Sequence, residues 1–153
     1  MRTVEPIQPG DSGGDAPARI AIVEDDYLVA FAMEEALVEA GFDVVALASS
    51  AEEILDLAST ARPTLAVMDI RLNGARDGID AALELFAKHG IRSVFATAYQ
   101  TREMRARAEP ARPLAWLSKP YVMSALVDSI RRALGELAEE PGRDKNAAGI
   151  PQA

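Results

Sequence analysis

Short apolar runs alternate with longer amphipathic segments along the middle of the chain. The short runs predict five strands, at residues 19–24, 42–48, 64–68, 93–96 and 115–118. Apolar positions at helical spacing predict helices at 27–40, after Ser50, around Ile79, Leu83 and Phe86, and at 123–139, with a weaker, arginine-rich helix at 100–109. Regular alternation of strands and helices is typical of an α/β fold with a doubly wound, five-stranded parallel sheet.

Local signals place several helix ends. Gly41 fits the left-handed stop of the first helix, and Phe31 falls off that helix's apolar face. Ser50 followed by Glu53 has the spacing of a capping box. Pro110 ends the arginine-rich helix, because the residue before a proline disfavours the helical conformation.

Length and composition limit the number of domains and the classes of function that the chain can have. The 153 residues suit one domain, predicted at 19–139, between a disordered tail at 1–18 and a flexible tail at 140–153. The net charge of −8 argues against nucleic-acid binding, and the absence of cysteine excludes thiolate chemistry.

His89 is the single histidine and is expected at a helix end. We find no apolar run of membrane length and no signal peptide, so a cytoplasmic location is expected.

Polar side chains follow four of the predicted strands. Glu24 ends the first strand and Asp25 follows it, and Asp69 follows the third strand. Thr97 and Lys119 follow the fourth and fifth. The carboxyl ends of parallel strands share one edge of the sheet, so these groups are expected to converge there. Clustered carboxylates favour a magnesium ion.

The same residue types support phosphoryl chemistry. Asp69 stands alone after a wholly apolar strand and is the predicted nucleophile, which would form an aspartyl phosphate. Lys119 would bind one phosphate oxygen, and Thr97 would donate a hydrogen bond to another.

In five places the sequence resembles the receiver family of bacterial two-component response regulators, over almost all of 19–139. The motifs are Val-Glu-Asp-Asp at 23–26, Met-Asp-Ile-Arg-Leu at 68–72, Asp-Gly at 77–78, Phe-Ala-Thr-Ala at 95–98 and Leu-Ser-Lys-Pro at 117–120. The resemblance implies a strand order of second, first, third, fourth and fifth. It also implies a phosphorylated signalling protein rather than an enzyme, one that assists its own phosphorylation and dephosphorylation.

Residue roles are carried over from this resemblance. Asp69 would be the phosphoacceptor, and Lys119 would clamp the phosphoryl group and precede a cis proline. Thr97 and Trp116 would form the switch pair. The implied Mg²⁺ ligands are Glu24, Asp25, Asp69 and the backbone carbonyl of Arg71.

The sequence departs from the family pattern in three places. Asn73 replaces the usual proline in the loop after the phosphoacceptor, and this loop is about one residue longer than is common. Trp116 replaces a smaller switch aromatic. Ala98 replaces the glycine of a receiver branch that carries Phe-Ala-Thr-Gly.

The resemblance implies a stand-alone response regulator. A sensor histidine kinase or histidine phosphotransfer protein would phosphorylate it, and a downstream protein would bind the altered face. Tyr27, Leu28 and Phe31 form a predicted kinase-docking patch, with packing against the tail or a neighbouring helix as the alternative. The amphipathic final helix permits a homodimer.

Other interpretations remain at this point. Asp25 and Asp26 could cap the helix that follows them, and Lys119 could be a solvated surface lysine. A degenerate receiver, acting as a phosphorylation-independent interaction or dimerisation module, is the second hypothesis for function. A hydrolytic phosphatase is the third, although it would need a further acid or base that the sequence does not reveal.

Overall fold

The computed structural model describes residues 16–140. The predicted tails at 1–18 and 140–153 therefore lie outside the described residues, except for 16–18 and 140. The elements in chain order are β1 (Arg19–Val23), α1 (Tyr27–Glu39), β2 (Asp43–Ala48), α2 (Ala51–Ala61), β3 (Leu65–Met68), α3 (Gly78–His89), β4 (Arg92–Thr97), α4 (Arg102–Ala108), the 3₁₀ turn η1 (Glu109–Ala111), β5 (Ala115–Ser118) and α5 (Met123–Glu139).

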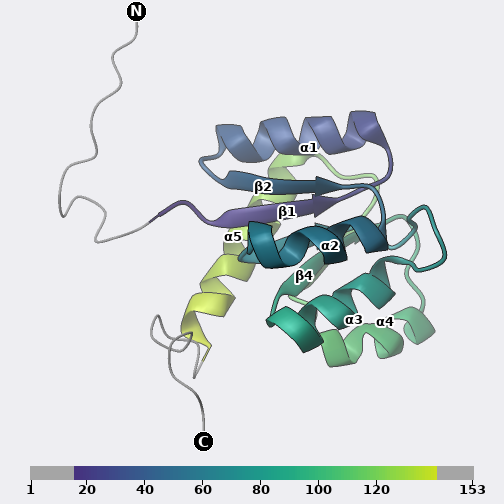
Figure 1. Cartoon of the computed structure of the whole chain (residues 1–153). Coiled ribbons are helices and arrows are strands. Elements are labelled where there is room, and N and C mark those ends of the chain that lie inside the picture. The colour runs from purple at the N-terminus through teal and green to yellow at the C-terminus, as the bar shows by residue number, and fades with distance from the viewer. Residues whose placement is uncertain (1–15, 141–153) are drawn as a thin grey trace, which may run out of the picture.

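The five strands form one parallel sheet in the order β2-β1-β3-β4-β5. This confirms the predicted doubly wound fold and its strand order. Helices α1 and α5 pack on one face of the sheet, and α2, α3 and α4 pack on the other (Figure 1). Both faces are covered, so the central strands can be apolar along their whole length.

Successive side chains along the strands are buried on opposite faces of the sheet. In β1, Ile20 and Ile22 face the core under α1 and α5, whereas Ala21 and Val23 face the core under α2 and α3. All four residues are fully buried, and so is every residue of β3. Each fully buried isoleucine or leucine contributes roughly 1.5–3 kcal/mol of transfer free energy.

The predicted helix faces are partly right. In α1, Met33 and Leu37 are buried as predicted, and Phe31 is exposed. In α3 the buried face carries Leu85, whereas Leu83 and Phe86 are only half-buried. Small alanines at positions 81 and 82 let α3 lie close to the sheet, so the larger side chains lie at the margin of the contact.

The caps show where local signals failed. Ser50 accepts the backbone N–H of Glu53, as predicted, but the Glu53 carboxylate accepts the N–H and hydroxyl of Ser49. The predicted reciprocal box at α2 is therefore wrong. A complete box occurs at α3 instead, between Asp77 and Asp80.

The boundaries of α4 also differ from the prediction. Thr101 caps this helix by accepting the N–H of Met104, so α4 begins two residues later than the predicted segment. The helix ends at Ala108 and continues as the 3₁₀ turn that contains Pro110. At the end of α1, Gly41 has the predicted positive φ of 99°. His89 is exposed and is the last residue of α3.

Candidate phosphoacceptor site

The sheet topology brings the predicted site residues together. Glu24 and Asp69 directly follow β1 and β3, which are neighbours in the sheet. Thr97 is the last residue of β4, and Lys119 directly follows β5. Together with Asp25 and Arg71, these residues line an open hollow of about 550 Å³ at the carboxyl edge of the sheet. Such an edge is where doubly wound folds bind ligands.

Three carboxylates meet in this hollow. One oxygen from each of Glu24, Asp25 and Asp69 lies within 4.8 Å of the other two. Glu24 is 4% exposed and Asp69 is 7% exposed. Burying several carboxylates together costs free energy unless positive charge accompanies them. The donor set and its spacing fit a small divalent cation that binds oxygen ligands, such as Mg²⁺.

One lysine supplies positive charge beside the acids. The Lys119 Nζ lies 3.1 Å from Glu24 Oε1 and 3.3 Å from Asp69 Oδ2. The Lys119–Pro120 peptide bond is cis, as the resemblance implied. Partial burial acts to lower the pKa of Lys119, but the charges of Asp69 and Glu24 outweigh it and raise that pKa. Lys119 is therefore charged at neutral pH, and it is not the solvated lysine of the alternative interpretation.

Burial dominates the titration of Glu24. It raises the pKa of the Glu24 carboxyl, and the negative charge of Asp69 adds to this effect. The backbone N–H of Asp26 and the ammonium of Lys119 offset part of the rise. The site therefore disfavours the full set of negative charges and favours the arrival of a cation.

The acids after β1 could either cap α1 or join the carboxylate cluster, and the structure shows that Asp26 and Asp25 differ in this respect. Asp26 is the N-cap of α1, and its carboxylate accepts the backbone N–H groups of Leu28 and Val29. Asp25 instead lies in the carboxylate cluster. The capping alternative is thus correct for Asp26.

Backbone contacts fix the position of the Asp69 segment. The N–H of Arg71 donates to Asp69 Oδ1 over 3.2 Å, and the N–H of Gly78 donates to the carbonyl of Ile70 over 2.7 Å. A Cβ at Gly78 would lie only 2.0 Å from the Asp69 carbonyl oxygen. The role of the Arg71 carbonyl as a metal ligand stays a prediction.

The predicted switch residues lie on neighbouring strands. Thr97 is 2% exposed, and its hydroxyl makes only long contacts of 3.4 and 3.5 Å with the backbone of Tyr99. Trp116 is half-buried and stacks on the buried ring of Phe95, with 4.6 Å between ring centroids. Their switching roles stay predictions.

The long loop after Asp69 is anchored by contacts that the sequence did not reveal. Asn73 forms a parallel bridge with Ser50, at the start of α2. The guanidinium of Arg76 lies 3.3 Å from Glu52 in α2 and 2.8 Å from Glu84 in α3. This loop is therefore tied to two helices without the usual proline. Arg76 and the acidic residues of the two helices were visible in the sequence, but Glu52 is 24 residues away from Arg76 and Glu84 is eight residues away, so the sequence did not show which residues pair.

Comparisons with known proteins support the fold and identify the family. The family profile of the response regulator receiver domain matches residues 20–131. The chain belongs to the response regulator receiver family. It is 35% identical over 129 residues to the transcriptional regulatory protein PdtaR of Mycobacterium tuberculosis, a match that covers 84% of this chain and 62% of PdtaR.

A second relative is the phyllosphere-induced regulator PhyR of Methylorubrum extorquens, which is 32% identical over 115 residues. That match covers 74% of this chain and 43% of PhyR. This chain therefore spans less than two thirds of the length of both relatives.

Two solved structures share the fold. The signal receiver domain of a modulated diguanylate cyclase from Desulfovibrio desulfuricans G20 has a TM-score of 0.73 and 33% identity, over 79% of this chain and 96% of that domain. A CheY-like receiver domain protein from Methanospirillum hungatei JF-1 has a TM-score of 0.72 and 25% identity, with the same coverage. Among the described residues, no helix is long and apolar enough to cross a membrane.

Proposed function

We propose that this chain is a phosphorylation-controlled signalling protein that accepts a phosphoryl group on Asp69 in a magnesium-dependent reaction. The observation that carries this proposal is the contact of Lys119 Nζ with both Glu24 and Asp69, beside a cluster of three carboxylates. An aspartate, a lysine and an acid cluster at one sheet edge are the parts that aspartyl phosphorylation requires.

In the reaction, an Oδ atom of Asp69 attacks the phosphorus of the donor. The new O–P bond forms as the bond between phosphorus and the donor breaks, and the donor keeps the electron pair. Lys119 would then exchange its contact with the carboxylate for a phosphoryl oxygen. The buried hydroxyl of Thr97 would donate to another phosphoryl oxygen, because its present contacts are long and easily replaced.

Glu24, Asp25, Asp69 and the backbone carbonyl of Arg71 would hold the magnesium ion. When bound, Mg²⁺ supplies charge neutralisation for the phosphoryl oxygens. The pKa of Glu24 is already raised by burial and by Asp69, so added positive charge relieves an existing cost. The likeness to receivers supports the same assignment.

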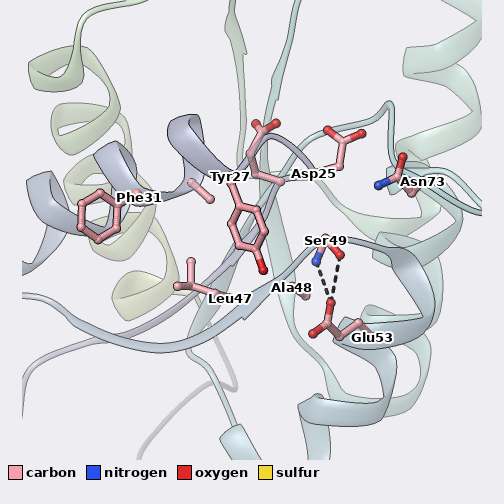
Figure 2. A pocket seen from close by; sticks show the side chains of 10 residues that line it. Asp25, Tyr27, Phe31, Leu47, Ala48, Ser49, Glu53 and Asn73 are labelled. Atoms are coloured by element: carbon pink, nitrogen blue, oxygen red, sulfur yellow. Dashed lines mark hydrogen bonds between the residues drawn. The ribbon is translucent and has the colours of Figure 1, made fainter.

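The phosphodonor is proposed to be a sensor histidine kinase or histidine phosphotransfer protein that docks on α1. Tyr27, Leu28 and Phe31 are 89%, 81% and 59% exposed. A groove of about 310 Å³ runs from Tyr27 and Phe31 past Leu47 and Ser49 to Asp25, which belongs to the acid cluster (Figure 2). A donor protein seated there would lie next to Asp69.

The segment of the chain that carries this surface is acidic, which indicates the charge expected on the donor's docking segment. Between positions 20 and 61 the sequence contains no lysine or arginine, and it contains ten aspartates and glutamates. The docking segment of the donor is therefore expected to carry basic residues around an apolar side chain, because complementary charge speeds association.

Intact-mass measurement tests the proposed function. The wild type and Asp69→Asn are incubated with acetyl phosphate, with and without Mg²⁺. We expect one phosphoryl adduct, on the wild type only and with Mg²⁺ only. If no adduct forms under any condition, the phosphoacceptor proposal fails and the phosphorylation-independent interaction module is favoured.

A further inference from the structure

Tyr121 carries a buried hydroxyl group without a hydrogen-bond partner. The residue lies between the cis peptide bond at Pro120 and the start of α5 at Met123. Its side chain packs against the core under α1 and α5, and its Oη atom has no partner within residues 16–140, the part that the structure describes. Most buried hydroxyl groups are hydrogen-bonded, because burial removes their contacts with water. The hydroxyl of Tyr121 is therefore an unused donor in this state of the protein.

The charged residues of the site lie on the same side of the sheet as Tyr121. Side chains two positions apart on a strand point to the same face. The last residues of β1, β3 and β5 that pack under α1 and α5 are Ile22, Val67 and Leu117. Two positions farther along are Glu24, Asp69 and Lys119. The N–H groups of these three still donate to carbonyls of the neighbouring strand, so the alternation extends to them.

The charges of these groups act on the phenol. Burial raises the pKa of the Tyr121 hydroxyl, the ammonium of Lys119 lowers it, and the carboxylates of Glu24 and Asp69 add to the rise. Of the two carboxylates, Glu24 has the larger effect. The raised pKa keeps the hydroxyl protonated at neutral pH, so it can donate a hydrogen bond, and Glu24 is the acceptor that the charges indicate.

Glu24 loses a donor if Lys119 turns to a phosphoryl group. The residue is 4% exposed, and its two oxygens have different donors. The N–H of Asp26 donates to Oε2 over 3.1 Å, and Lys119 Nζ donates to Oε1 over 3.1 Å. Departure of the ammonium would leave Oε1 buried without a donor, which is unfavourable. A hydroxyl on the side of α1 and α5 can replace it.

We propose that Tyr121 is a positioning residue whose hydroxyl donates to Glu24 when Lys119 moves to a phosphoryl group on Asp69. Before phosphorylation Lys119 occupies Glu24 Oε1, and Tyr121 has no acceptor. After phosphorylation the O–H of Tyr121 replaces the ammonium and holds the Glu24 carboxylate in place. A donor that is used in only one of two states favours that state. This inference rests on the proposed function, because the phosphoryl group is what draws Lys119 away.

Removal of Lys119 tests the exchange without a phosphoryl group. In Lys119→Met, Glu24 Oε1 has lost its ammonium, so the Tyr121 hydroxyl should move to it. Urea denaturation at about pH 8, which favours ionised Glu24, compares the wild type, Tyr121→Phe, Lys119→Met and the double variant. Tyr121→Phe should leave the wild-type midpoint unchanged or raise it, because the lost hydroxyl makes no bond there. It should lower the midpoint of Lys119→Met. Equal shifts in the two backgrounds would overturn the exchange.

A phosphoryl mimic tests the exchange at the complete site. Beryllium fluoride is titrated at saturating Mg²⁺, and the apparent affinity of Tyr121→Phe should be about tenfold weaker than that of the wild type, as expected for one lost buried hydrogen bond. Tyr99→Phe is the matched control, since it removes the same hydroxyl from a side chain that is 66% exposed, and it should bind like the wild type. In protein labelled with 3-fluorotyrosine, the fluorine resonance that Tyr121→Phe removes belongs to Tyr121. This resonance should shift when the mimic binds.

The outcomes separate this inference from the proposed function. If the wild type forms the acetyl phosphate adduct but Tyr121→Phe binds the mimic as tightly as the wild type, Tyr121 has no positioning role and the proposed function stands. An unshifted Tyr121 resonance in the wild type with the mimic bound leads to the same conclusion. If the wild type forms no adduct and binds no mimic, the proposed function fails and the role of Tyr121 fails with it.

Discussion

At Gly78 the start of α3 lies against the backbone of Asp69, the proposed phosphoacceptor. A side-chain carbon there would lie 2.0 Å from the carbonyl oxygen of Asp69 and 2.8 Å from the Cα of Ile70. Neither atom is the end of a flexible side chain, so the backbone would have to move. The missing Cβ at Gly78 therefore sets the distance between α3 and Asp69.

Replacement of Gly78 by alanine should be strongly destabilising. We expect a loss of about 3 kcal/mol in the free energy of unfolding, because backbone atoms must shift to make room. Gly135→Ala is the control, since a Cβ there meets no atom within 4 Å. It should stabilise α5 by about 0.5–1 kcal/mol, the usual advantage of alanine in a helix. Urea denaturation measures both, and equal effects of the two changes would contradict this account of Gly78.

At the scale of elements, α4 is short and depends on side-chain contacts with its neighbours. Arg107 contacts the Asp77 carboxylate at the start of α3 at 2.5 and 2.6 Å, and it lies 3.6 Å from Asp80. Burial acts to raise the pKa of Asp77, but the Arg107 contact and the backbone N–H groups of Asp80 and Ile79 outweigh burial and lower that pKa.

This pair predicts a pH dependence of stability. Asp77 has a lower pKa in the folded protein than its ordinary value of 3.8, so its stabilisation is present above about pH 4 and is lost as the pH falls below it. Arg107→Ala should cost about 0.5–1 kcal/mol at pH 6, where the pair is ionised and partly exposed. Below pH 4 the difference from the wild type should shrink.

Asp77→Asn is the matched variant, because asparagine keeps a capping oxygen but not the charge. In an Asp77→Asn background, removal of Arg107 should cost much less at pH 6. Thermal denaturation between pH 3 and pH 6 measures these differences. A cost of Arg107→Ala that does not change over this range would show that the ion pair contributes no stability.

A comparison of the predicted and observed elements shows which of them local sequence signals can predict. Alternation of apolar runs predicted all five strands, because a strand buried on both faces needs a continuous apolar stretch. The start of α4 at Arg102 was missed, since its cap depends on a single threonine hydroxyl. The face of α3 was misplaced toward Leu83 because sequence spacing alone does not show how closely small alanines let a helix approach the sheet.

Over the whole molecule, acidic and apolar surface gather at α1 and the adjoining edge of the sheet. Phe31 lines two neighbouring hollows, one that reaches Asp25 and one that is bounded by Glu34, Glu35 and Val38. Phe31 thus occupies the centre of the proposed docking surface.

Phe31→Asp should slow phosphotransfer from the cognate donor protein by about tenfold or more, as expected for loss of a central aromatic anchor. The rate with acetyl phosphate should not change, because that donor needs no docking surface. Val38→Asp adds the same charge to the same helix seven residues farther along, and it should have a smaller effect. Equal slowing with both donors would refute the docking role, and the time course of phosphoprotein formation measures it.

The site was predictable because the strands of a parallel sheet end at one edge. The polar residues after them could therefore be placed together without knowledge of any contact. The contacts of Arg76 with Glu52 and Glu84, and of Arg105 with Trp116, could not be predicted in this way. They join surface side chains from different elements, and no periodicity in the sequence encodes such pairs.

The most direct test of the central claim locates the phosphoryl group itself. The wild type is treated with acetyl phosphate and Mg²⁺ and then reduced with borohydride, which converts an aspartyl phosphate to homoserine. Tandem mass spectrometry of the peptides then identifies the altered residue. We predict homoserine at position 69 and at no other carboxylate. Homoserine at position 25 or 26, or unmodified Asp69 in a protein that carries the adduct, would contradict the account.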